Sequence, residues 1–265
     1  MIVSLLTDFG LSDEYAGLMK AVIYSINADA KVVDLSHHVP AHDVAAASFL
    51  LASSYPFFPP GTVHVAVVDP GVGTSRRILA AKHNGHIFLA PDNGLLTVPL
   101  SEGRTELMVS VSNQSYFLKE QSATFHGRDI FAPVAAYLTR GVALDKLGPP
   151  MQPGKMIQLP GVLASRRGKT IVGRVVAVDR FGNLVTNIPA GIVRDLVDET
   201  GGVSPSVAVD GTPVNGFYAS YGQAPENTPF VLVGSRGTLE VAVRERSAAR
   251  HLNVEAGAMV LVEAE

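Results

Sequence analysis

The strongest constraint on the fold is the alternation of short β-branched runs with longer helical patterns over the first 147 residues. Residues 2–7, 31–35 and 62–68 are apolar, rich in β-branched side chains, and short enough to be buried strands. Residues 13–26 and 43–54, which separate them, carry apolar side chains at helical spacing. Strands and helices in alternation are typical of crossover units around a mostly parallel sheet. We therefore predict an α/β fold, with helices flanking the sheet.

A tight hairpin interrupts the parallel arrangement. Residues 78–82 and 86–90 are two strand-like runs that flank Asn84 and Gly85. This pair of residues readily adopts positive φ, as a two-residue hairpin turn requires. The predicted sheet is therefore mixed.

The pattern changes in the second half of the chain. Prolines and glycines accumulate between residues 148 and 168, as expected for a connection between domains. We predict an α/β domain at residues 1–150, a linker at 151–168 and a smaller domain at 169–265. Short strand-like runs with little helix predict an antiparallel β-barrel or sandwich for the last domain, at 171–178, 184–188, 207–209, 230–233 and 239–243.

Composition restricts the class of protein. The chain has 265 residues, of which 47% are hydrophobic and 17% charged, a net charge of −3 and no cysteine. Such a chain forms compact domains without disulfides or thiolate metal ligands. The slight acidic excess argues against nucleic-acid binding, which needs clustered cations. The apolar N-terminal run is too short for a membrane span and lacks the flanks of a signal peptide, so we expect a cytoplasmic protein with a small-molecule partner.

Asp69 follows the strand-like run at 62–68 and begins the glycine-rich segment DPGVGTSRR. In open α/β sheets, ligands bind beyond the carboxyl ends of the strands. Arg76 can fold back onto the Asp69 carboxylate, and His126 opens a later helical pattern. Arginine keeps a neighbouring aspartate ionised, and histidine can hydrogen-bond the pair or move a proton. These residues are candidates for orienting water; the alternatives are a simple turn at Asp69 and a structural ion pair with an unrelated histidine.

Three further loops carry candidate binding groups. Asp8 ends the first predicted strand and can bind two ribose hydroxyls, with helix capping as the alternative. Asp179, Phe181 and Asn183 share one loop, which suits an ammonium group, a stacked ring and a base edge, or is a plain hairpin turn. The GSRG loop at 234–237 offers backbone donors and a hydroxyl to a carboxylate, or is another turn.

A cluster of histidines suggests a metal site. His37, His38, His42 and Asp43 are close in sequence, and two-metal hydrolases use such ligands. However, the chain has no HExxH motif, and adjacent histidines point to opposite sides of an extended chain. We expect no metal, and a metal-dependent phosphoesterase stays an alternative.

A set of motifs runs along nearly the whole chain: TDFG at Thr7, DVAAASFLL at Asp43, FFPPGTVHVAVVDPGVGTSR at Phe57, APDNGLL at Ala90, TFHGRDIFAP at Thr124, DRFGNLVTNI at Asp179 and GSRGTLEVAV at Gly234. Each motif alone is weak, but in this order they are highly specific. Together they resemble the S-adenosylmethionine hydroxide adenosyltransferase family. This family comprises adenosine-forming S-adenosylmethionine hydrolases and is related to bacterial fluorinating and chlorinating enzymes.

The resemblance implies a homotrimer with each active site between the N-terminal domain of one subunit and the C-terminal domain of its neighbour. It also implies in-line attack of water on the 5′ carbon of S-adenosylmethionine, which gives adenosine and methionine without a cofactor. By motif position, the residues that handle water are Asp69, Arg76 and His126. Asp8 is then the ribose ligand and Asn183 the adenine ligand. The methionine end is held by Asp13, Asp179, Ser235 and Arg236.

The chemistry of the reaction agrees with these roles. The leaving group is a neutral thioether departing from a sulfonium, so no general acid is needed and catalysis consists of positioning and desolvating water. Arg76 can stabilise developing hydroxide while Asp69 and His126 orient the water or take its proton. The aromatic groups that can face the purine or the sulfonium are Phe125, Phe181 and Tyr218.

Two positions favour hydrolysis over halogenation. Fluorinating relatives have tyrosine and serine where this chain has Asp69 and Gly127, and a fixed carboxylate repels halide. The chain departs from the family pattern at His42, where relatives carry a larger aromatic or aliphatic residue, and at Arg244, where a smaller polar residue is expected. We predict an S-adenosylmethionine hydrolase; the alternative of another class is a non-catalytic sensor of adenosine or S-adenosylmethionine.

Overall fold

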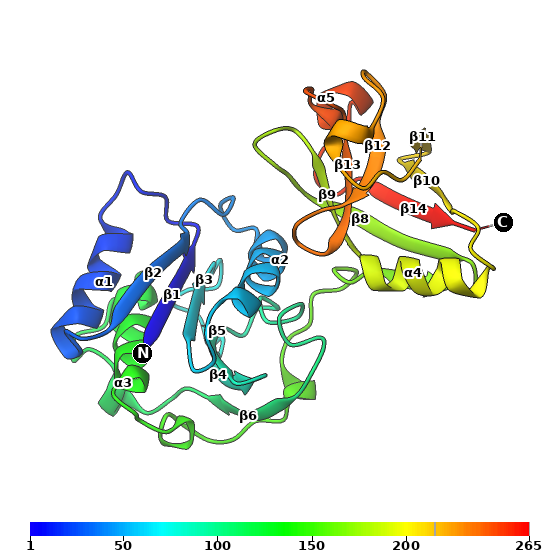
Figure 1. The fold of residues 1–265 in the computed structure, drawn as a ribbon. Helices are drawn as coiled ribbons and strands as arrows, with labels where there is room; N and C mark the ends of the chain where they lie inside the picture. Colours follow the sequence, from blue (N-terminus) through cyan, green and yellow to red (C-terminus); the bar gives the residue numbers. More distant parts are fainter. Residues whose placement is uncertain (215, 265) are drawn as a thin grey trace. The chain divides into compact units, whose positions relative to one another are not determined.

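The computed structural model describes residues 1–214 and 216–264, which form two compact units that divide between residues 159 and 160 (Figure 1). Each unit has its own sheet and its own hydrophobic core. The segment predicted as a linker crosses the division between the units, and its last residues form strand β7 (Ser165–Arg167), which pairs with β8. Within the described residues, no helix has the length and apolar character to cross a membrane.

The first unit is built on a six-stranded mixed sheet with the strand order β2-β1-β3-β5-β4-β6. β1 pairs in parallel with β2 and β3, and β3 pairs in parallel with β5, whereas β4 runs antiparallel to β5 and β6. The predicted α/β fold and the hairpin at Asn84 and Gly85 are confirmed, and both turn residues have positive φ. The strands are β1 (Ile2–Thr7), β2 (Lys31–Ser36), β3 (Val63–Val67), β4 (Ile78–His83), β5 (His86–Pro91) and β6 (Thr105–Ser110).

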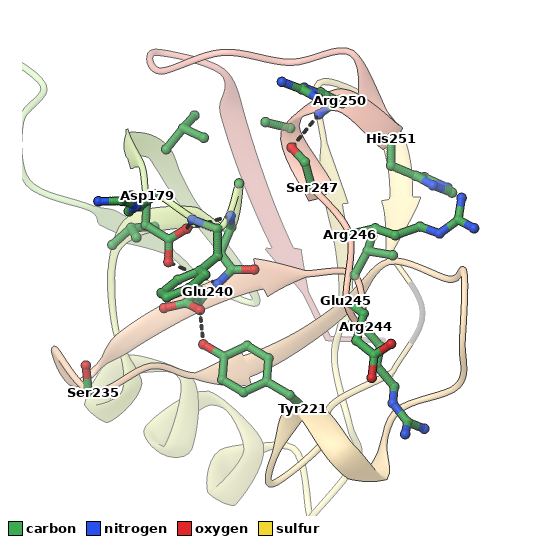
Figure 2. A pocket seen from close by; sticks show the side chains of 18 of the residues that line it. Asp179, Tyr221, Ser235, Glu240, Arg244, Glu245, Arg246, Ser247, Arg250 and His251 are labelled. Carbon is green, nitrogen blue, oxygen red and sulfur yellow. Dashed lines mark hydrogen bonds between the residues drawn. The ribbon is translucent and has the colours of Figure 1, made fainter.

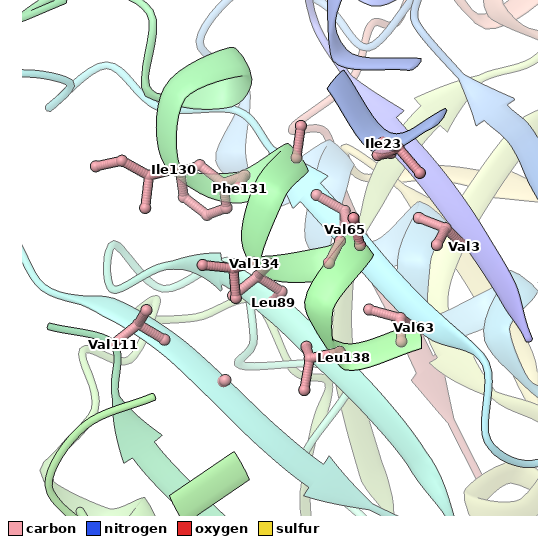
Figure 3. Packing of buried hydrophobic residues seen from close by; sticks show 14 of the residues in the cluster. Val3, Ile23, Val63, Val65, Leu89, Val111, Ile130, Phe131, Val134 and Leu138 are labelled. Carbon is pink, nitrogen blue, oxygen red and sulfur yellow. The ribbon is translucent and has the colours of Figure 1, made fainter. Parts of the chain in front are cut away.

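Helices cover both faces of this sheet. Val3 and Val65 point to the face covered by α1 and α3 (Figure 3), whereas Leu6 and Ala66 point to the face covered by α2. Because β1 and β3 are covered on both sides, polar groups gather in the loops beyond their carboxyl ends. The helices are α1 (Tyr15–Ile26), α2 (Val44–Ser54) and α3 (Ala132–Thr139), with short turns η1 (Tyr55–Phe57), η2 (Gln114–Tyr116), η4 (Leu144–Lys146) and η5 (Pro153–Lys155) and a π-helix, η3 (Gly127–Phe131).

The second unit is a nearly closed, barrel-like antiparallel sheet, as predicted. Its strand order is β11-β10-β14-β8-β9-β13-β12, with β7 on the edge of β8. The remaining strands are β8 (Thr170–Val178), β9 (Leu184–Pro189), β10 (Ser206–Val209), β11 (Thr212–Val214), β12 (Phe230–Val233), β13 (Thr238–Ala242) and β14 (Met259–Glu263). Helices α4 (Ala190–Glu199) and α5 (Ala248–Leu252) and the turn η6 (Tyr221–Gln223) complete the unit.

Candidate functional site

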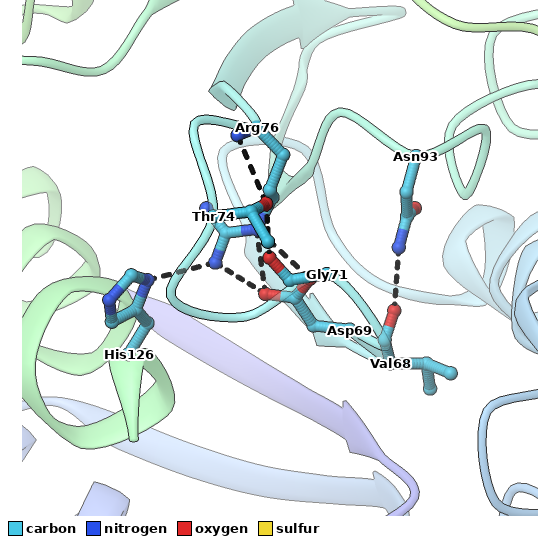
Figure 4. A network of polar contacts seen from close by, with 7 residues as sticks. All are labelled: Val68, Asp69, Gly71, Thr74, Arg76, Asn93 and His126. Carbon is cyan, nitrogen blue, oxygen red and sulfur yellow. Dashed lines mark hydrogen bonds and ion pairs between the residues drawn. The ribbon is translucent and has the colours of Figure 1, made fainter. Parts of the chain in front are cut away.

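Asp69 lies just beyond the carboxyl end of β3, at the start of a tight turn. Within this turn the Thr74 hydroxyl donates to a backbone carbonyl at 2.7 Å. Gly73 has a φ of 77°, and a Cβ at this position would lie 2.3 Å from the carbonyl oxygen of Ala123. Only glycine fits such a close approach of two backbone segments. The turn brings Arg76 back to face Asp69 (Figure 4).

Asp69, Arg76 and His126 form one connected network (Figure 4). Nε of Arg76 donates to Oδ1 and Oδ2 of Asp69 at 2.9 and 2.8 Å, and Nη2 also contacts Oδ2. The same Nη2 donates to Nδ1 of His126 at 2.9 Å. The side chains of Asp69 and Arg76 are 4% and 9% exposed, so this ion pair is largely removed from water. The structure therefore brings together the three residues that the sequence grouped.

Arg76 sets the protonation state of His126. A guanidinium only donates hydrogen bonds, so Nδ1 of His126 accepts and the neutral ring carries its proton on Nε2. Burial, and next the positive charge of Arg76, lower the pKa of His126 below its ordinary value of 6.5. The carboxylates of Asp69 and Asp129 act in the opposite direction without reversing the shift. His126 is thus a neutral donor through Nε2 near pH 7.

A buried carboxylate holds the segment that carries His126. Asp129, in η3, is fully buried and accepts hydrogen bonds from the backbone N–H of Ser122 at 2.7 Å and from Nε of Arg128 at 2.6 Å. Its backbone carbonyl accepts from the N–H of Leu118 at 2.9 Å. These bonds tie the preceding loop to the π-helix, a type of turn that is frequent at functional sites.

A cavity of about 320 Å³ opens beside the network. The rings of Phe9, Tyr15 and Phe125 form an aromatic wall, with centroids 4.9 to 5.9 Å apart. The sequence singled out Phe125 but missed the two other rings, because nothing local marks them as neighbours of Asp69. The lining consists of Asp8, Phe9, Tyr15, Ala41, His42, Val67, Asp69, Val72, Thr124, Phe125, His126 and Gly127.

Asp8 presents a carboxylate to this cavity. Its Oδ2 accepts the backbone N–H of His42 at 2.9 Å, and no described residue donates to its Oδ1. The helix-capping alternative is wrong, because the residue at the N-cap of α1 is Glu14. His42 adopts a φ of 65° and its side chain is 74% exposed. Asp13 lies in an exposed bend and is not among the residues that line the cavity.

The second unit contains an open cleft of about 1480 Å³. Asp179, Phe181, Asn183, Ser235 and Arg236 all line it, so the structure gathers the predicted residues of this unit at one place, except Tyr218. Oδ1 of Asp179 accepts the backbone N–H groups of Phe181 and Asn183 at 2.8 and 2.9 Å, and Oδ2 accepts Nδ2 of Asn183 at 3.0 Å. The Asp179 loop is thus a turn closed by its own hydrogen bonds, and it lines the cleft.

Two family models match this two-part architecture. The model for the SAM hydroxide adenosyltransferase N-terminal domain matches residues 3–148, and the model for the C-terminal domain of the same family matches residues 173–261. The chain belongs to the SAM hydroxide adenosyltransferase family.

Full-length relatives of this family member are enzymes. A protein of Salinispora arenicola named (R)-S-adenosyl-L-methionine hydrolase is 36% identical over 99% of this chain and 97% of its own length. A protein of Thermus thermophilus with the same name is also 36% identical, over 96% of each chain. A fluorinase of Actinopolyspora mzabensis is 28% identical over 98% of this chain and 96% of its own. The crystal structure of an uncharacterised conserved protein from Thermotoga maritima superimposes with a TM-score of 0.90 at 36% identity and covers both chains fully.

Besides Phe181, the aromatic residue that lines the cleft is Tyr221, whereas the sequence suggested Tyr218. Tyr218 packs edge-on against Phe230, with ring centroids 5.6 Å apart, and is not among the residues that line the cleft. Tyr221 lines the cleft and donates its hydroxyl proton to Oε1 of Glu240 at 2.5 Å (Figure 2). Arg244 also lines the cleft, and its Nη1 lies 3.9 Å from Oε1 of Glu226.

The clustered histidines have separate environments. His37 is buried, where its Nδ1 is 2.8 Å from the hydroxyl of Thr7 and its Nε2 is 3.1 Å from Oδ1 of Asp34. His42 instead lies at the rim of the first cavity. Over residues 1–214 and 216–264, no three His, Cys, Asp or Glu side chains are grouped closely enough to hold a metal ion.

Proposed function

We propose that this protein hydrolyses S-adenosylmethionine to adenosine and methionine by in-line attack of water at the 5′ carbon of the ribose. The observation that carries the proposal is the buried network of Asp69, Arg76 and His126 at the edge of a small cavity with an aromatic wall. The names of the full-length relatives support the same reaction. We assign catalytic roles to the three residues of the network.

In this reaction the C5′–O bond forms as the C5′–S bond breaks, and the electron pair of the broken bond stays on sulfur. The leaving methionine is a neutral thioether, so its departure needs no proton. The attacking water becomes a strongly acidic protonated alcohol, and a carboxylate is a sufficient base for it. Asp69 accepts this proton, because Arg76 occupies only part of its lone pairs and Nε2 of His126 already carries hydrogen.

The other residues position the reactants. The Nε2–H of His126 donates to the water oxygen and directs its remaining lone pair at the 5′ carbon. Oδ1 of Asp8, the oxygen that does not bind the backbone N–H of His42, accepts hydrogen bonds from the ribose hydroxyls. The aromatic wall excludes bulk water and favours the positive charge of the sulfonium. Asn183 binds adenine, and Asp179, Ser235 and Arg236 bind the methionine end.

A direct assay of the purified protein tests the proposal. S-adenosylmethionine is incubated with the protein, with and without a chelator, and products are separated by chromatography. We expect adenosine and methionine in equal amounts, at the same rate in both samples. Bound but unconsumed substrate would favour a sensor, and activity lost on chelation would favour the metal-dependent alternative.

We also propose a homotrimer in which the cavity of one copy and the cleft of its neighbour form one active site. The division of the predicted ligands between two compact units supports this arrangement. At a substrate concentration well below KM, the single variants Asp69→Asn and Arg236→Ala then each impair a different half of a site. If sites are shared, a mixture of the two variants after subunit exchange is faster than either variant alone. A monomer mass measured by light scattering would contradict the trimer.

A further inference from the structure

His37 is a buried histidine that the proposed reaction does not use. It follows β2 in the chain, and its side chain is 1% exposed. Nε2 of the ring lies 3.1 Å from Oδ1 of Asp34, whose other carboxylate oxygen accepts a hydrogen bond from Nζ of Lys20 on α1 at 2.5 Å. A carboxylate only accepts hydrogen bonds, so the ring carries a proton on Nε2. In the neutral ring, Nδ1 is therefore an acceptor.

Nδ1 of His37 faces the hydroxyl of Thr7, the last residue of β1. The two atoms are 2.8 Å apart, so the Thr7 hydroxyl donates to the ring. The oxygen of the same hydroxyl accepts the backbone N–H of Phe9 at 3.2 Å. Thr7 is fully buried, and a buried hydroxyl that loses its partner is costly. The imidazole therefore fixes the direction of the hydroxyl, and the hydroxyl fixes the backbone on both sides of Asp8.

The backbone of the segment that begins at His37 contacts the same turn. The carbonyl of His37 accepts the N–H of Gly10 at 2.7 Å, and five residues later the N–H of His42 donates to Oδ2 of Asp8 at 2.9 Å. Because β1 and β2 pair in parallel, the turn after β1 and the segment after β2 leave the sheet at the same edge. The segment after β2 therefore holds the turn with one side chain and with its backbone.

The turn that is held in this way supplies two groups to the cavity. Asp8 lines the cavity with its carboxylate, and Phe9 contributes one ring of the aromatic wall. Thr7 and His37 are not among the residues that line it. Groups that bind a ligand must be held within about 0.5 Å of the productive geometry by their neighbours. The contacts of His37 provide such support without touching the ligand.

We propose that His37 is a positioning residue that aims the Asp8 carboxylate at the ribose hydroxyls and so sets the preference for a ligand that carries them. It acts through the Thr7 hydroxyl and through its own carbonyl. An apolar side chain would fill the same space, but it would leave the buried Thr7 hydroxyl without its acceptor. Asp34 orients the ring through Nε2. This inference rests on the proposed function, in which Asp8 is the ribose ligand.

The test compares S-adenosylmethionine with its 2′,3′-dideoxy analogue, which lacks both hydroxyls that Asp8 would bind. We expect wild type to prefer S-adenosylmethionine roughly 10- to 100-fold in kcat/KM, because the analogue leaves a polar group of the site unpaired. His37→Leu lowers this preference at least about fivefold, through a higher KM for S-adenosylmethionine, and Thr7→Val does the same. His37→Asn keeps an acceptor near the position of Nδ1 and restores most of the preference.

His83→Leu is the matched control. His83 is also fully buried in the first unit, and its ring nitrogens lie 2.9 Å from the Thr105 hydroxyl and 2.8 Å from the Glu102 carbonyl, but it does not line the cavity. We expect His83→Leu to lower stability while the preference stays within about twofold of wild type. Circular dichroism reports the fold of each variant. If His37→Leu fails to fold, Thr7→Val decides on the same criterion.

Equal losses on both substrates in His37→Leu and Thr7→Val, or none on either, would overturn the inference and leave His37 as a packing group. A wild type without the preference would also refute it, because Asp8 would then bind no ribose hydroxyl. If wild type turns over neither substrate, the proposed function fails, and calorimetric titration with adenosine and 2′,3′-dideoxyadenosine tests the positioning role alone. A selective loss of adenosine affinity in His37→Leu would support that role, and equal affinity of wild type for the two nucleosides would refute it.

Discussion

The cavity of the first unit and the cleft of the second differ in how their charges are satisfied. Around Asp69, every charged group of the network is paired within the protein, and the ion pair is more than nine-tenths buried. In the cleft, Arg236 is exposed, and Oε2 of Glu240 accepts no hydrogen bond from the residues that the structure describes. The cleft is also the larger of the two, at about 1480 Å³ against about 320 Å³. Under the proposed function, the groups assigned to the transition state are paired in advance, whereas the groups assigned to the ligand's own charges have hydrogen-bonding capacity left.

The largest effect expected from this contrast is at Asp69. Asp69→Asn keeps the shape of the side chain but removes the base and the charge opposite Arg76. We expect kcat to fall by at least about 100-fold with KM changed little, because the interaction matters in the transition state. Adenosine release measures this, and Asp29→Asn, an exposed acid of the same unit, serves as the control. A kcat within tenfold of wild type would remove Asp69 from catalysis.

The next effect concerns pH. The lowered pKa of His126 keeps the ring neutral to below pH 6.5, so activity should be constant near neutrality and fall as pH decreases through that lowered pKa. Protonation of His126 at Nδ1 removes the hydrogen-bond acceptor for Nη2 of Arg76 and places an imidazolium beside a guanidinium. A second histidine affects stability over the same pH range. Burial lowers the pKa of His64 in the folded protein to about 3, so below pH 6.5 the unfolded chain binds a proton there that the folded protein does not. The free energy of unfolding therefore also decreases as the pH falls below 6.5.

Activity and stability must therefore be separated in this experiment. The kcat from about pH 8 to about pH 5 is measured together with circular dichroism at each pH. We expect kcat to decline while the native signal persists. A decline that only follows unfolding, or a His126→Gln variant with the wild-type profile, would contradict the role of His126.

For Arg236, in the cleft, we expect a change in KM rather than in kcat. Arg236→Ala removes an exposed cation that, under the proposed function, binds the ligand equally in the ground and transition states. We expect KM to rise roughly 10-fold with kcat nearly unchanged. Initial rates over a range of S-adenosylmethionine concentrations give both values, with Arg194→Ala on α4 as the control. A fall in kcat as large as that of Asp69→Asn would erase the distinction between the two regions.

The smallest effect is expected at His42, where the sequence suggested a departure from the family pattern. Asp8 contacts the backbone N–H of His42, which any residue except proline retains, and the imidazole is mostly exposed. Asparagine also tolerates the positive φ of this position, so His42→Asn should not strain the backbone. We expect KM to change by less than about threefold. A larger change would show that the imidazole itself shapes the ribose end of the cavity.

Local signals account for what the sequence predicted. Buried β-branched runs and the Asn84–Gly85 turn specified the first sheet, because strand burial and turn conformation are encoded within a few residues. The contact between Arg76 and Asp69 followed from the glycine-rich turn between them. Motif order along the chain identified the family, which physical patterning alone did not reach.

The features that the sequence did not predict depend on distant neighbours. Helix α4 was missed although its buried residues, Ala190, Val193 and Leu196, lie at helical spacing, because the strand-like runs around it suggested a domain with little helix. Tyr221 and Glu240 are brought together by a loop that folds over β13, and no spacing rule relates them. Tyr218 and Tyr221 are equally plausible by sequence, and only packing against Phe230 shows which ring is in the core.

The most direct test of the account is the fate of the water oxygen. The protein is incubated with S-adenosylmethionine in water enriched in ¹⁸O, and the mass of the adenosine formed is measured. Attack at the 5′ carbon predicts adenosine that carries one heavy oxygen at the 5′ position and unlabelled methionine. Adenosine without the label would show that water does not attack this carbon and would contradict the mechanism assigned to Asp69, Arg76 and His126.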